Sequence, residues 1–441
     1  MEKELTLHFK LNNEPWSGNV DPNQSVLDFL RSLNLNSVKA GCRVGDCGIC
    51  TILLDGEPVR SCMLKNRDIE DHSISTLEGL TQEGKIHPLQ ESFIETGAIQ
   101  CGFCTPAQIL TAKAFLDKNP NPSDEEIRTA LKDVLCRCTG YVRIVDGVKR
   151  AAARLRGEKL DAYGPIYLEL PDDINDIRIP DPFFRKGDDQ HPLPPLVYTP
   201  AAMLKTNIVN KAEKKVDAEK LAGGKPAFTD DFRPQGMLFG ALLTSNVAHA
   251  RIRSINTEKA KALPGVRTVL TYKDLPRVKY ASGGQSYPQP LPYDQVCLDN
   301  KVRHVGDRVA VVAADTQEIA DKALQLIEVD YEMLEAVVDP RDAMREGAPV
   351  IHDEDDTEGI HDAKHNIVHH IEAQNGDPDK AFTEAEHVFT GDFRTPKQQH
   401  AQLEPHICIT YYDPDNRMVV LSSTQVPFHV RRIIAPLIDM P

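Results

Sequence analysis

The stretch "GCRVGDCGIC" at residues 41–50 places three cysteines and three glycines within ten positions, and eleven residues separate its end from a fourth cysteine, Cys62. Glycines at Gly41, Gly45 and Gly48 supply backbone conformations that a side chain would forbid. The loop can therefore turn its amide groups inward toward a bound group. This composition predicts a site built from thiolates and backbone amides.

The spacing of this first cysteine set indicates which group it binds. The set consists of Cys42, Cys47, Cys50 and Cys62. Gaps of four and two residues followed by a distant fourth ligand are typical of a plant-type 2Fe-2S cluster. Zinc is the alternative, but structural zinc prefers paired C-x2-C knuckles, which this loop lacks. The spacing therefore predicts an iron-sulfur cluster.

A second cysteine set follows further along the chain. It consists of Cys101 and Cys104 in "QCGFCTP" with Cys136 and Cys138 in "LCRCTGY". Its spacing suits zinc or iron. Because a chain with one one-electron centre gains a function from a second one nearby, we expect a second 2Fe-2S cluster. The two remaining cysteines, Cys297 and Cys408, stand alone and are interpreted as core residues.

Length and composition exclude several classes of protein. A chain of 441 residues predicts about three domains. Its net charge of -15 argues against a nucleic-acid partner, because no basic surplus exists to displace counterions from phosphates. No apolar run is long enough to span a membrane, and no leader is apparent. Grouped cysteines without a secretion signal favour a cytoplasmic protein with metal-ligating thiols.

Hydrophobic periodicity divides the chain into five regions. Residues 1–75 predict strands, one helix at "DPNQSVLDFLRSL" and a hairpin at "CTILLDGEPVRSC", whose turn is Asp55-Gly56. The pattern in residues 76–156 predicts four short helices, and Ser123 and Glu126 form a capping box at the start of one of them. Residues 157–214 are a proline-rich extended connector. Residues 215–345 alternate strand and helix, and 346–441 begin another domain with an acidic surface loop at 347–379.

Several of these stretches resemble one family. "KAGCRVGDCGICTILLDGEPVRSC", "IQCGFCTPAQIL" and "LCRCTGY" are similar to the two iron-sulfur domains of the xanthine dehydrogenase and aldehyde oxidoreductase family of molybdenum hydroxylases. "MLFGALLTSNVAHARI", "KVRHVGDRVAVVAADT" and "SSTQVPFHVRR" resemble the first half of its molybdenum-binding region. The resemblance implies a multidomain α+β fold: a β-grasp ferredoxin-like 2Fe-2S domain, a four-helix 2Fe-2S domain, an α/β hammerhead-type domain and the start of the molybdopterin-binding domain.

The resemblance also implies an activity. Members of the family oxidise a C-H bond of an aldehyde or N-heterocycle with oxygen from water, at molybdenum held by molybdopterin, which in some members carries a cytosine dinucleotide. Electrons then pass to the cluster of Cys101, Cys104, Cys136 and Cys138, and on to that of Cys42, Cys47, Cys50 and Cys62. A purine such as xanthine is the preferred substrate, and an aldehyde is the alternative.

Three further residues are assigned by the resemblance alone. Gln100 and Cys138 match positions that contact the pterin, and Gln425 in "SSTQ" matches a glutamine that approaches the molybdenum ligands. From the sequence without the family, Gln100 and Gln425 are ordinary polar surface residues. Glu404 in "LEPH" lies in a family motif but is given no chemical role.

The chain departs from the family pattern in three ways. Lys132, Asp133 and Val134 replace the usual residues before "LCRCTGY", which leaves the local helix end undefined. No FAD segment lies between the iron-sulfur and molybdenum regions, so an FAD subunit or soluble carrier is expected to accept the electrons. The catalytic glutamate of the family has no match and is expected beyond residue 441. A second molybdopterin-binding chain, in a hetero-oligomer, or a missing C-terminal half would complete the site.

Two other interpretations remain open. The chain could be a non-catalytic, two-cluster electron-transfer subunit, although the presence of Gln100, Cys138 and Gln425 favours the hydroxylase. The histidines of the acidic loop could bind a metal, since His361 and His365 have helical spacing. Because this segment lacks apolar support, a solvated loop is the preferred interpretation.

Overall fold

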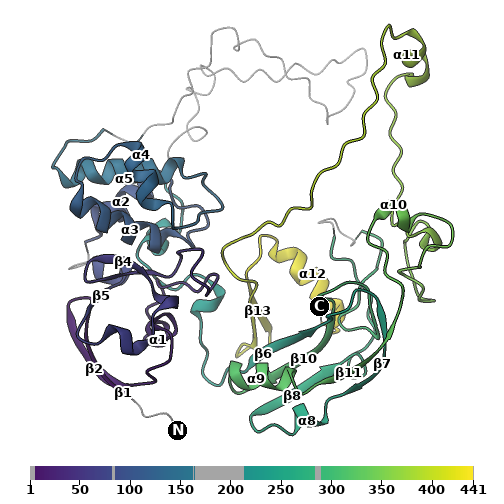
Figure 1. The fold of residues 1–441 in the computed structure, drawn as a ribbon, viewed down its shortest axis with the longest axis horizontal. Helices are drawn as coiled ribbons and strands as arrows, with labels where there is room; N and C mark the ends of the chain where they lie inside the picture. Colours follow the sequence, from purple (N-terminus) through teal and green to yellow (C-terminus); the bar gives the residue numbers. More distant parts are fainter. Residues whose placement is uncertain (1–4, 82–84, 162, 164–212, 284–289, 441) are drawn as a thin grey trace. The chain divides into compact units, whose positions relative to one another are not determined.

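The structure, a computed structural model, describes all residues except 1–4, 82–84, 162, 164–212, 284–289 and 441 (Figure 1). It divides into two compact units. The first comprises Met1–Phe232 and Gln398–Ser423, and the second comprises Arg233–Lys397 and Thr424–Pro441. Most of the predicted connector at 157–214 lies outside the described residues.

The first unit opens with a five-stranded sheet in the order β2-β1-β5-β3-β4. Its strands are β1 (Leu5–Leu11), β2 (Glu14–Val20), β3 (Thr51–Leu54), β4 (Glu57–Arg60) and β5 (Ser73–Ser75). β1 pairs with β5 in parallel, whereas the other neighbours pair antiparallel. Helix α1 (Val26–Ser32) buries Phe29 and Leu30 with Leu7 and Ile52 of the sheet. The predicted small sheet on one helix is confirmed.

The β3–β4 hairpin determines where the fourth cysteine of the first set lies. Asp55 and Gly56 form its turn with φ values of 50° and 85°, as the sequence predicts. Cys50 immediately precedes β3, and Cys62 lies just beyond β4 in a short 3-10 helix, Ser61–Met63. The Ser61 hydroxyl donates to the Cys50 carbonyl at 2.8 Å. The hairpin therefore returns Cys62 to the neighbourhood of Cys50.

Four helices form the next part of the first unit, as predicted. They are α2 (Pro88–Glu95), α3 (Thr105–Lys118), α4 (Asp124–Leu131) and α5 (Val142–Leu155). Their core includes the buried side chains of Leu89, Phe93, Ile109, Ile127 and Val148. Helix α4, whose end the sequence leaves undefined, ends at Leu131, so the following segment is free to turn toward the first cysteine loop.

The sheet and the helices share an apolar face. Helix α3 packs on β3, and Leu53 is buried there with Leu110 and Ala114. A later segment of the chain also joins this unit. Helix α7 (Ala218–Ala222) adds Leu221 to the helical core, and the 3-10 helix η5 (Thr229–Asp231) follows it. The short hairpin β12 (Cys408–Tyr412) and β13 (Met418–Ser422) belongs to the same unit.

The second unit contains two three-stranded antiparallel sheets, β6-β10-β8 and β11-β7-β9 (Figure 1). The strands are β6 (Phe239–Thr244), β7 (Ala250–Asn256), β8 (Val266–Thr271), β9 (Lys301–Val302), β10 (Arg308–Ala314) and β11 (Glu328–Met333). Helix α9 (Gln317–Leu324) packs on β6 and β10, where Val312 and Ala320 are fully buried. The predicted succession of strand, helix and strand at "RVAVVAA", "TQEIADKALQLI" and "EVDYEML" is confirmed.

The remaining helices of the second unit are short or peripheral: α8 (Glu258–Lys261), α10 (Pro340–Ala343), α11 (Pro378–Glu384) and α12 (Pro427–Leu437). Residues 368–397 are exposed throughout, and α11 lies at the tip of this arm (Figure 1). The interpretation of Cys297 and Cys408 as core residues is wrong, because both are exposed. An isolated cysteine has no neighbours in sequence that would report its burial.

The capping box at the start of α4 gives a direct test of the fold. The Ser123 hydroxyl accepts from the Glu126 amide at 3.3 Å, and the Glu126 carboxylate accepts from the Ser123 amide at 2.8 Å. We expect Ser123→Ala to lower the free energy of unfolding by about 1 kcal/mol, because a helix N-terminal amide loses its acceptor. Chemical denaturation would measure this. Ser123→Asp keeps an acceptor and serves as the control; equal losses in both variants would contradict this explanation.

Candidate metal centres

The first cysteine loop lies between α1 and β3 and turns its amides toward sulfur. The Cys42 Sγ accepts from the amides of Val44, Asp46 and Cys47 at 3.3 to 3.4 Å, and the Cys42 amide donates to the Cys47 Sγ at 3.4 Å. Burial opposes ionisation of Cys42, but these amides prevail and lower the pKa of its thiol to about 7. The loop amides therefore favour the thiolate form of Cys42.

Two glycines show why this loop excludes larger residues. A Cβ on Gly41 would lie 2.8 Å from the Cys47 Sγ. Gly48 has a φ of +69°, and a Cβ there would lie 2.0 Å from the Asp133 carbonyl oxygen. The sequence predicts inward-turning amides, and the structure adds a second reason for Gly48, which is close contact with the other cysteine loop.

The sulfurs of the first set meet in pairs. The Cys42 thiol is hydrogen-bonded to Cys47, and the Cys62 thiol is hydrogen-bonded to Cys50. Burial, followed by the neighbouring Cys50 thiol, raises the pKa of Cys62 to about 12. The raised pKa values of Cys47 and Cys62 favour the protonated form of both thiols, and metal binding would release these protons.

The second set is also arranged as two pairs. Cys101 and Cys104 lie directly before α3, and the other two cysteines lie between α4 and α5. Hydrogen bonding to Cys104 is the main cause that lowers the pKa of Cys136 to about 5, while the pKa of Cys104 is raised. Burial, and then its hydrogen bond with Cys138, raises the pKa of Cys101 to about 11.

Pairwise thiols fit a binuclear cluster. Each iron of a 2Fe-2S cluster takes two thiolates from the protein, which is the grouping that both sets show. Among the described residues, no group of three or more His, Cys, Asp or Glu is arranged to hold a metal ion. The donor chemistry of both sets, thiols in pairs with amides directed at sulfur, fits iron-sulfur clusters.

The two cysteine loops contact each other directly. The Leu135 amide donates to the Cys47 carbonyl at 2.9 Å. Leu135 directly precedes Cys136, so this hydrogen bond joins the backbones of the two cysteine loops. An apolar cluster shared by both loops surrounds this contact. Its buried members are Cys47, Ile49, Phe103, Cys104, Ala107 and Val134. The residues at 132–134, which left the helix end undefined in the sequence, thus form the junction between the loops.

The residues assigned to the pterin by resemblance lie at the surface. Gln100 is exposed directly before Cys101, and Cys138, whose thiol pairs with Cys101, is also exposed. The structure therefore places these two positions at the exposed end of the second set. Gln425 is exposed in the other unit, in the turn before α12.

Sequence reasoning missed a buried charge cluster beside the first loop. Lys39, three residues before Cys42, donates to the Asp231 carboxylate at 2.6 Å, and both side chains are fully buried. Glu404, which had no assigned role, accepts from the Thr229 backbone and lies near this pair, and burial raises its pKa. The only sequence signal was a lysine before the loop and the acidic pair in "FTDDF".

A second contact joins the later segment to the second cysteine loop. The Arg137 side chain, between Cys136 and Cys138, donates from Nε to the His400 carbonyl at 2.8 Å. Leu403 packs against the apolar cluster of the two loops. Residues 399–404, which include part of the "LEPH" motif, therefore lie along the cysteine loops.

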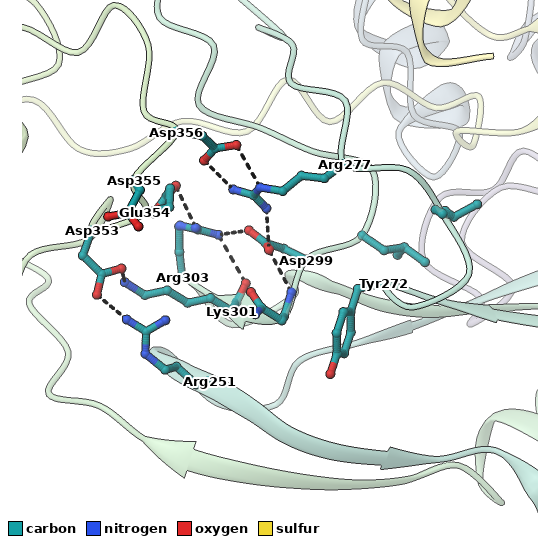
Figure 2. A pocket seen from close by; sticks show the side chains of 13 residues that line it. Arg251, Tyr272, Arg277, Asp299, Lys301, Arg303, Asp353, Glu354, Asp355 and Asp356 are labelled. Carbon is teal, nitrogen blue, oxygen red and sulfur yellow. Dashed lines mark hydrogen bonds and ion pairs between the residues drawn. The ribbon is translucent and has the colours of Figure 1, made fainter. Parts of the chain in front are cut away.

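The second unit contains a charged cavity of about 420 Å³, shown in Figure 2. Four basic and five acidic side chains line it. Lys301 contacts Asp353 at 2.7 Å and Arg303 contacts Glu354 at 2.9 Å. The acidic segment, which was interpreted as solvated, is thus tied to β9 by ion pairs. Two buried atoms of these residues, Arg303 Nε and Glu354 Oε2, have no hydrogen-bond partner among the described residues.

The histidines of the acidic loop do not converge. His365 contacts Glu346 at 3.0 Å and Asp362 at 2.7 Å, and these carboxylates raise its pKa. The ring of His361 instead lies 5.5 Å from that of His370. Helical spacing does not apply here, since the residues form a short 3-10 turn, Ala363–His365.

Gly48 provides a test of the contact between the cysteine loops. We expect Gly48→Ala to lower the free energy of unfolding of the first unit by about 3 kcal/mol or more, because the added methyl group would overlap the Asp133 carbonyl. Denaturant titration would measure the loss. Gly56→Ala has a similar positive φ with open space around it and should cost about 1 kcal/mol. Equal costs would contradict the proposed contact.

Glu354 provides a test of the ion pairs around the cavity. Burial would raise the pKa of Glu354, but the hydrogen bond from His352 and the charge of Arg303 lower it well below its usual range. Its contribution to stability is therefore present above about pH 4.5 and lost as the pH falls further. We expect Glu354→Gln to reduce the difference between unfolding midpoints at pH 7 and pH 3.5. Glu335→Gln, at an exposed position, should leave that difference unchanged; a similar effect in both variants would contradict this role.

Within the described residues, no helix combines the length and the apolar character that crossing a bilayer requires.

Four family models match successive parts of the chain. Their descriptions are 2Fe-2S iron-sulfur cluster binding domain at residues 9–77, 2Fe-2S binding domain at 76–149, aldehyde oxidase and xanthine dehydrogenase a/b hammerhead domain at 223–335, and molybdopterin cofactor-binding domain at 360–441. Together they follow the order of domains that the sequence resemblance implies.

Individual relatives agree with this order. A probable hypoxanthine oxidase of Escherichia coli is 32% identical over 99% of this chain, which spans 45% of that protein. The crystal structure of the aldehyde oxidoreductase from Desulfovibrio desulfuricans matches with a TM-score of 0.79 at 31% identity, over 99% of this chain and 45% of its own. The nicotinate dehydrogenase small FeS subunit of Eubacterium barkeri is 48% identical over 34% of this chain and 97% of that subunit. The two paired-thiol sites are followed along the chain by the match to a molybdopterin-binding domain. This chain therefore belongs to the xanthine dehydrogenase and aldehyde oxidoreductase family of molybdenum hydroxylases.

Proposed function

We propose that this chain is the iron-sulfur and molybdopterin part of a molybdenum hydroxylase. In this proposal it passes electrons from a molybdopterin site through two 2Fe-2S clusters to an external acceptor. The observation that carries it is the contact between two paired-thiol sites. Their buried sulfurs, on Cys47 and Cys104, share one apolar cluster, while Cys42 and Cys138 are exposed. This arrangement suits two centres in series with one accessible end each.

The chain offers a short route between the two sites through backbone bonds and one hydrogen bond. From Cys47 the route crosses one hydrogen bond to the Leu135 amide, and Cys136 is the next residue. Buried Phe103 and Val134 exclude water around this junction. Since water would add reorganisation energy to electron transfer, a dry and rigid junction favours rapid exchange between the sites.

We assign the Cys138 end to the molybdopterin. When bound, the molybdenum cofactor would supply the two-electron oxidation of a C-H bond with oxygen from water. Gln100 and Cys138 would contact the pterin beside the second cysteine set, and Gln425 is assigned to the molybdenum ligands by its match to the family motif alone. All three side chains are exposed and so are available to a cofactor. We leave the cytosine dinucleotide as one candidate form of the pterin.

We assign the Cys42 end to the electron acceptor. The exposed apolar side chains of Val44 and Met63, which are 64% and 60% exposed, flank this end of the first set. A Cβ on Gly45 would lie 2.9 Å from the Met63 Sδ, so the Met63 side chain packs close to the cysteine loop at Gly45. Such a patch suits docking of an FAD subunit or a soluble carrier close to the first cluster.

The exposed arm of the second unit supports a further protein partner. Phe382, Phe389 and Phe393 are 66% to 92% exposed along residues 368–397. Several exposed aromatic side chains along one segment suit a contact surface. We propose that a second molybdopterin-binding region, on another chain of a hetero-oligomer or on further sequence, covers this arm and supplies the catalytic glutamate.

For the substrate we favour a purine, with an aldehyde as the alternative. The relatives do not separate these choices: the Escherichia coli protein is named as a probable hypoxanthine oxidase, and the Desulfovibrio desulfuricans structure is an aldehyde oxidoreductase. A panel of xanthine, hypoxanthine, aldehydes and nicotinate with a dye acceptor would decide between them. We place the protein in the cytoplasm, because grouped cysteines that are free of disulfide bonds suit a reducing compartment.

A non-catalytic electron-transfer subunit is the competing function. Metal analysis of the chain purified with its partners separates the two. The hydroxylase predicts molybdenum together with about four irons per chain. Iron without molybdenum, when every partner is present, would support the electron-transfer subunit instead.

Cysteine variants test the two sites individually. We expect Cys42→Ser and Cys101→Ser each to lower iron from about four to about two per chain, because each removes one ligand of a different cluster. Colorimetric iron analysis and visible absorbance would measure this. Cys297→Ser, which changes an exposed cysteine outside both sets, is the matched control and should keep its iron. Equal iron in all three variants would contradict the assignment.

A further inference from the structure

The segment Phe228–Phe232 inserts a buried charge pair beside both cysteine loops. Lys39 is 2% exposed, and its Nζ lies 2.6 Å from the Asp231 Oδ2. The same oxygen accepts from the amides of Ala227 and Phe228 at 3.0 and 3.1 Å. Asp231 is thus held by its own turn, and it fixes the position of the Lys39 ammonium.

Aromatic rings connect this ammonium to the second loop. The Lys39 Nζ lies 4.5 Å from the centroid of the Phe228 ring. Phe228 in turn packs edge-on against Phe103 with centroids 5.0 Å apart, and Phe103 lies between Cys101 and Cys104. Along the chain, only two residues separate Lys39 from Cys42. The charge pair therefore lies close to both thiol sets.

Other charged groups around the pair are accounted for. Arg31 is 3.5 Å from the Asp231 Oδ1 and 2.9 Å from the Asp230 carboxylate, and it donates to the Val38 carbonyl at 2.9 Å. Glu404 and Glu78 also act on Lys39. Burying a lysine is costly unless it is paired, and the contact with Asp231 supplies that pairing.

We propose that Lys39 and Asp231 act as a positioning pair that sets the reduction potential of the adjacent clusters. This inference rests on the proposed function. Reduction adds negative charge to a cluster, and a fixed cation in a low-dielectric environment stabilises that charge. Lys39 raises the potential, and Asp231 both holds the ammonium in place and limits the size of its effect.

Redox titration of the full-length, iron-loaded chain, followed by electron paramagnetic resonance, tests this role. Lys39→Met should shift at least one cluster to a lower potential, because Asp231 remains paired with Arg31 and the cation is lost. Asp231→Asn should shift it to a higher potential, because Lys39 and Arg31 lose a counter-ion. A merely structural disturbance would move both variants in the same direction.

Two further variants serve as controls. Lys118→Met removes an exposed lysine that pairs with Glu57, and it should leave both potentials unchanged. Asp230→Asn removes a more exposed carboxylate from Arg31 and should give a smaller upward shift of the reduction potential. This variant can replace Lys39→Met or Asp231→Asn in the test if either of those does not load iron.

The outcomes distinguish the two proposals. Opposite shifts in Lys39→Met and Asp231→Asn would support the charge role. Iron-loaded variants whose potentials match that of Lys118→Met, or which shift in the same direction, would overturn this inference and leave the proposed function intact. A wild-type chain that takes up no iron under anaerobic, iron-replete conditions would overturn the proposed function and this inference with it.

Discussion

The contact between the two cysteine loops is the constraint on which the rest of this structure depends. Gly48 can approach the Asp133 carbonyl only because it has no side chain, and this approach allows the Leu135 amide to reach the Cys47 carbonyl. Both thiol sets then face one apolar cluster. Two domains with different folds, one with a sheet and one a helical bundle, are thereby joined in one compact unit.

Residues from later in the chain make further contacts with the cysteine loops. Asp231 pairs with Lys39 across 192 positions in the sequence, and Arg137 donates to the backbone of His400. These interactions bring the first residues of the hammerhead region and the "LEPH" segment onto the cysteine loops. Buried pairs are weak evidence for stability, since desolvation cancels much of their attraction. The position of the Lys39–Asp231 pair beside the cysteine loops fits an electrostatic role.

Much of the first unit could be predicted because its signals are local. Cysteine spacing, the Asp55-Gly56 turn and the Ser123 capping box each depend on residues close in sequence, and the structure shows the turn and the cap as expected. The contact of Gly48 with Asp133 and the pairing of Lys39 with Asp231 could not be predicted, because they join distant segments without a sequence pattern. The prediction that Cys297 and Cys408 are buried is wrong for a related reason: an isolated residue belongs to no periodic pattern.

The most direct measurement of the central claim is the magnetic interaction between the two sites in the dithionite-reduced chain. Electron paramagnetic resonance at low temperature should show two 2Fe-2S signals, and each should relax faster, or split, when the other cluster is also reduced. This result is expected because the Leu135 amide is hydrogen-bonded to the Cys47 carbonyl and both cysteine loops share one apolar cluster. One signal only, or two signals that are independent of each other, would contradict the account.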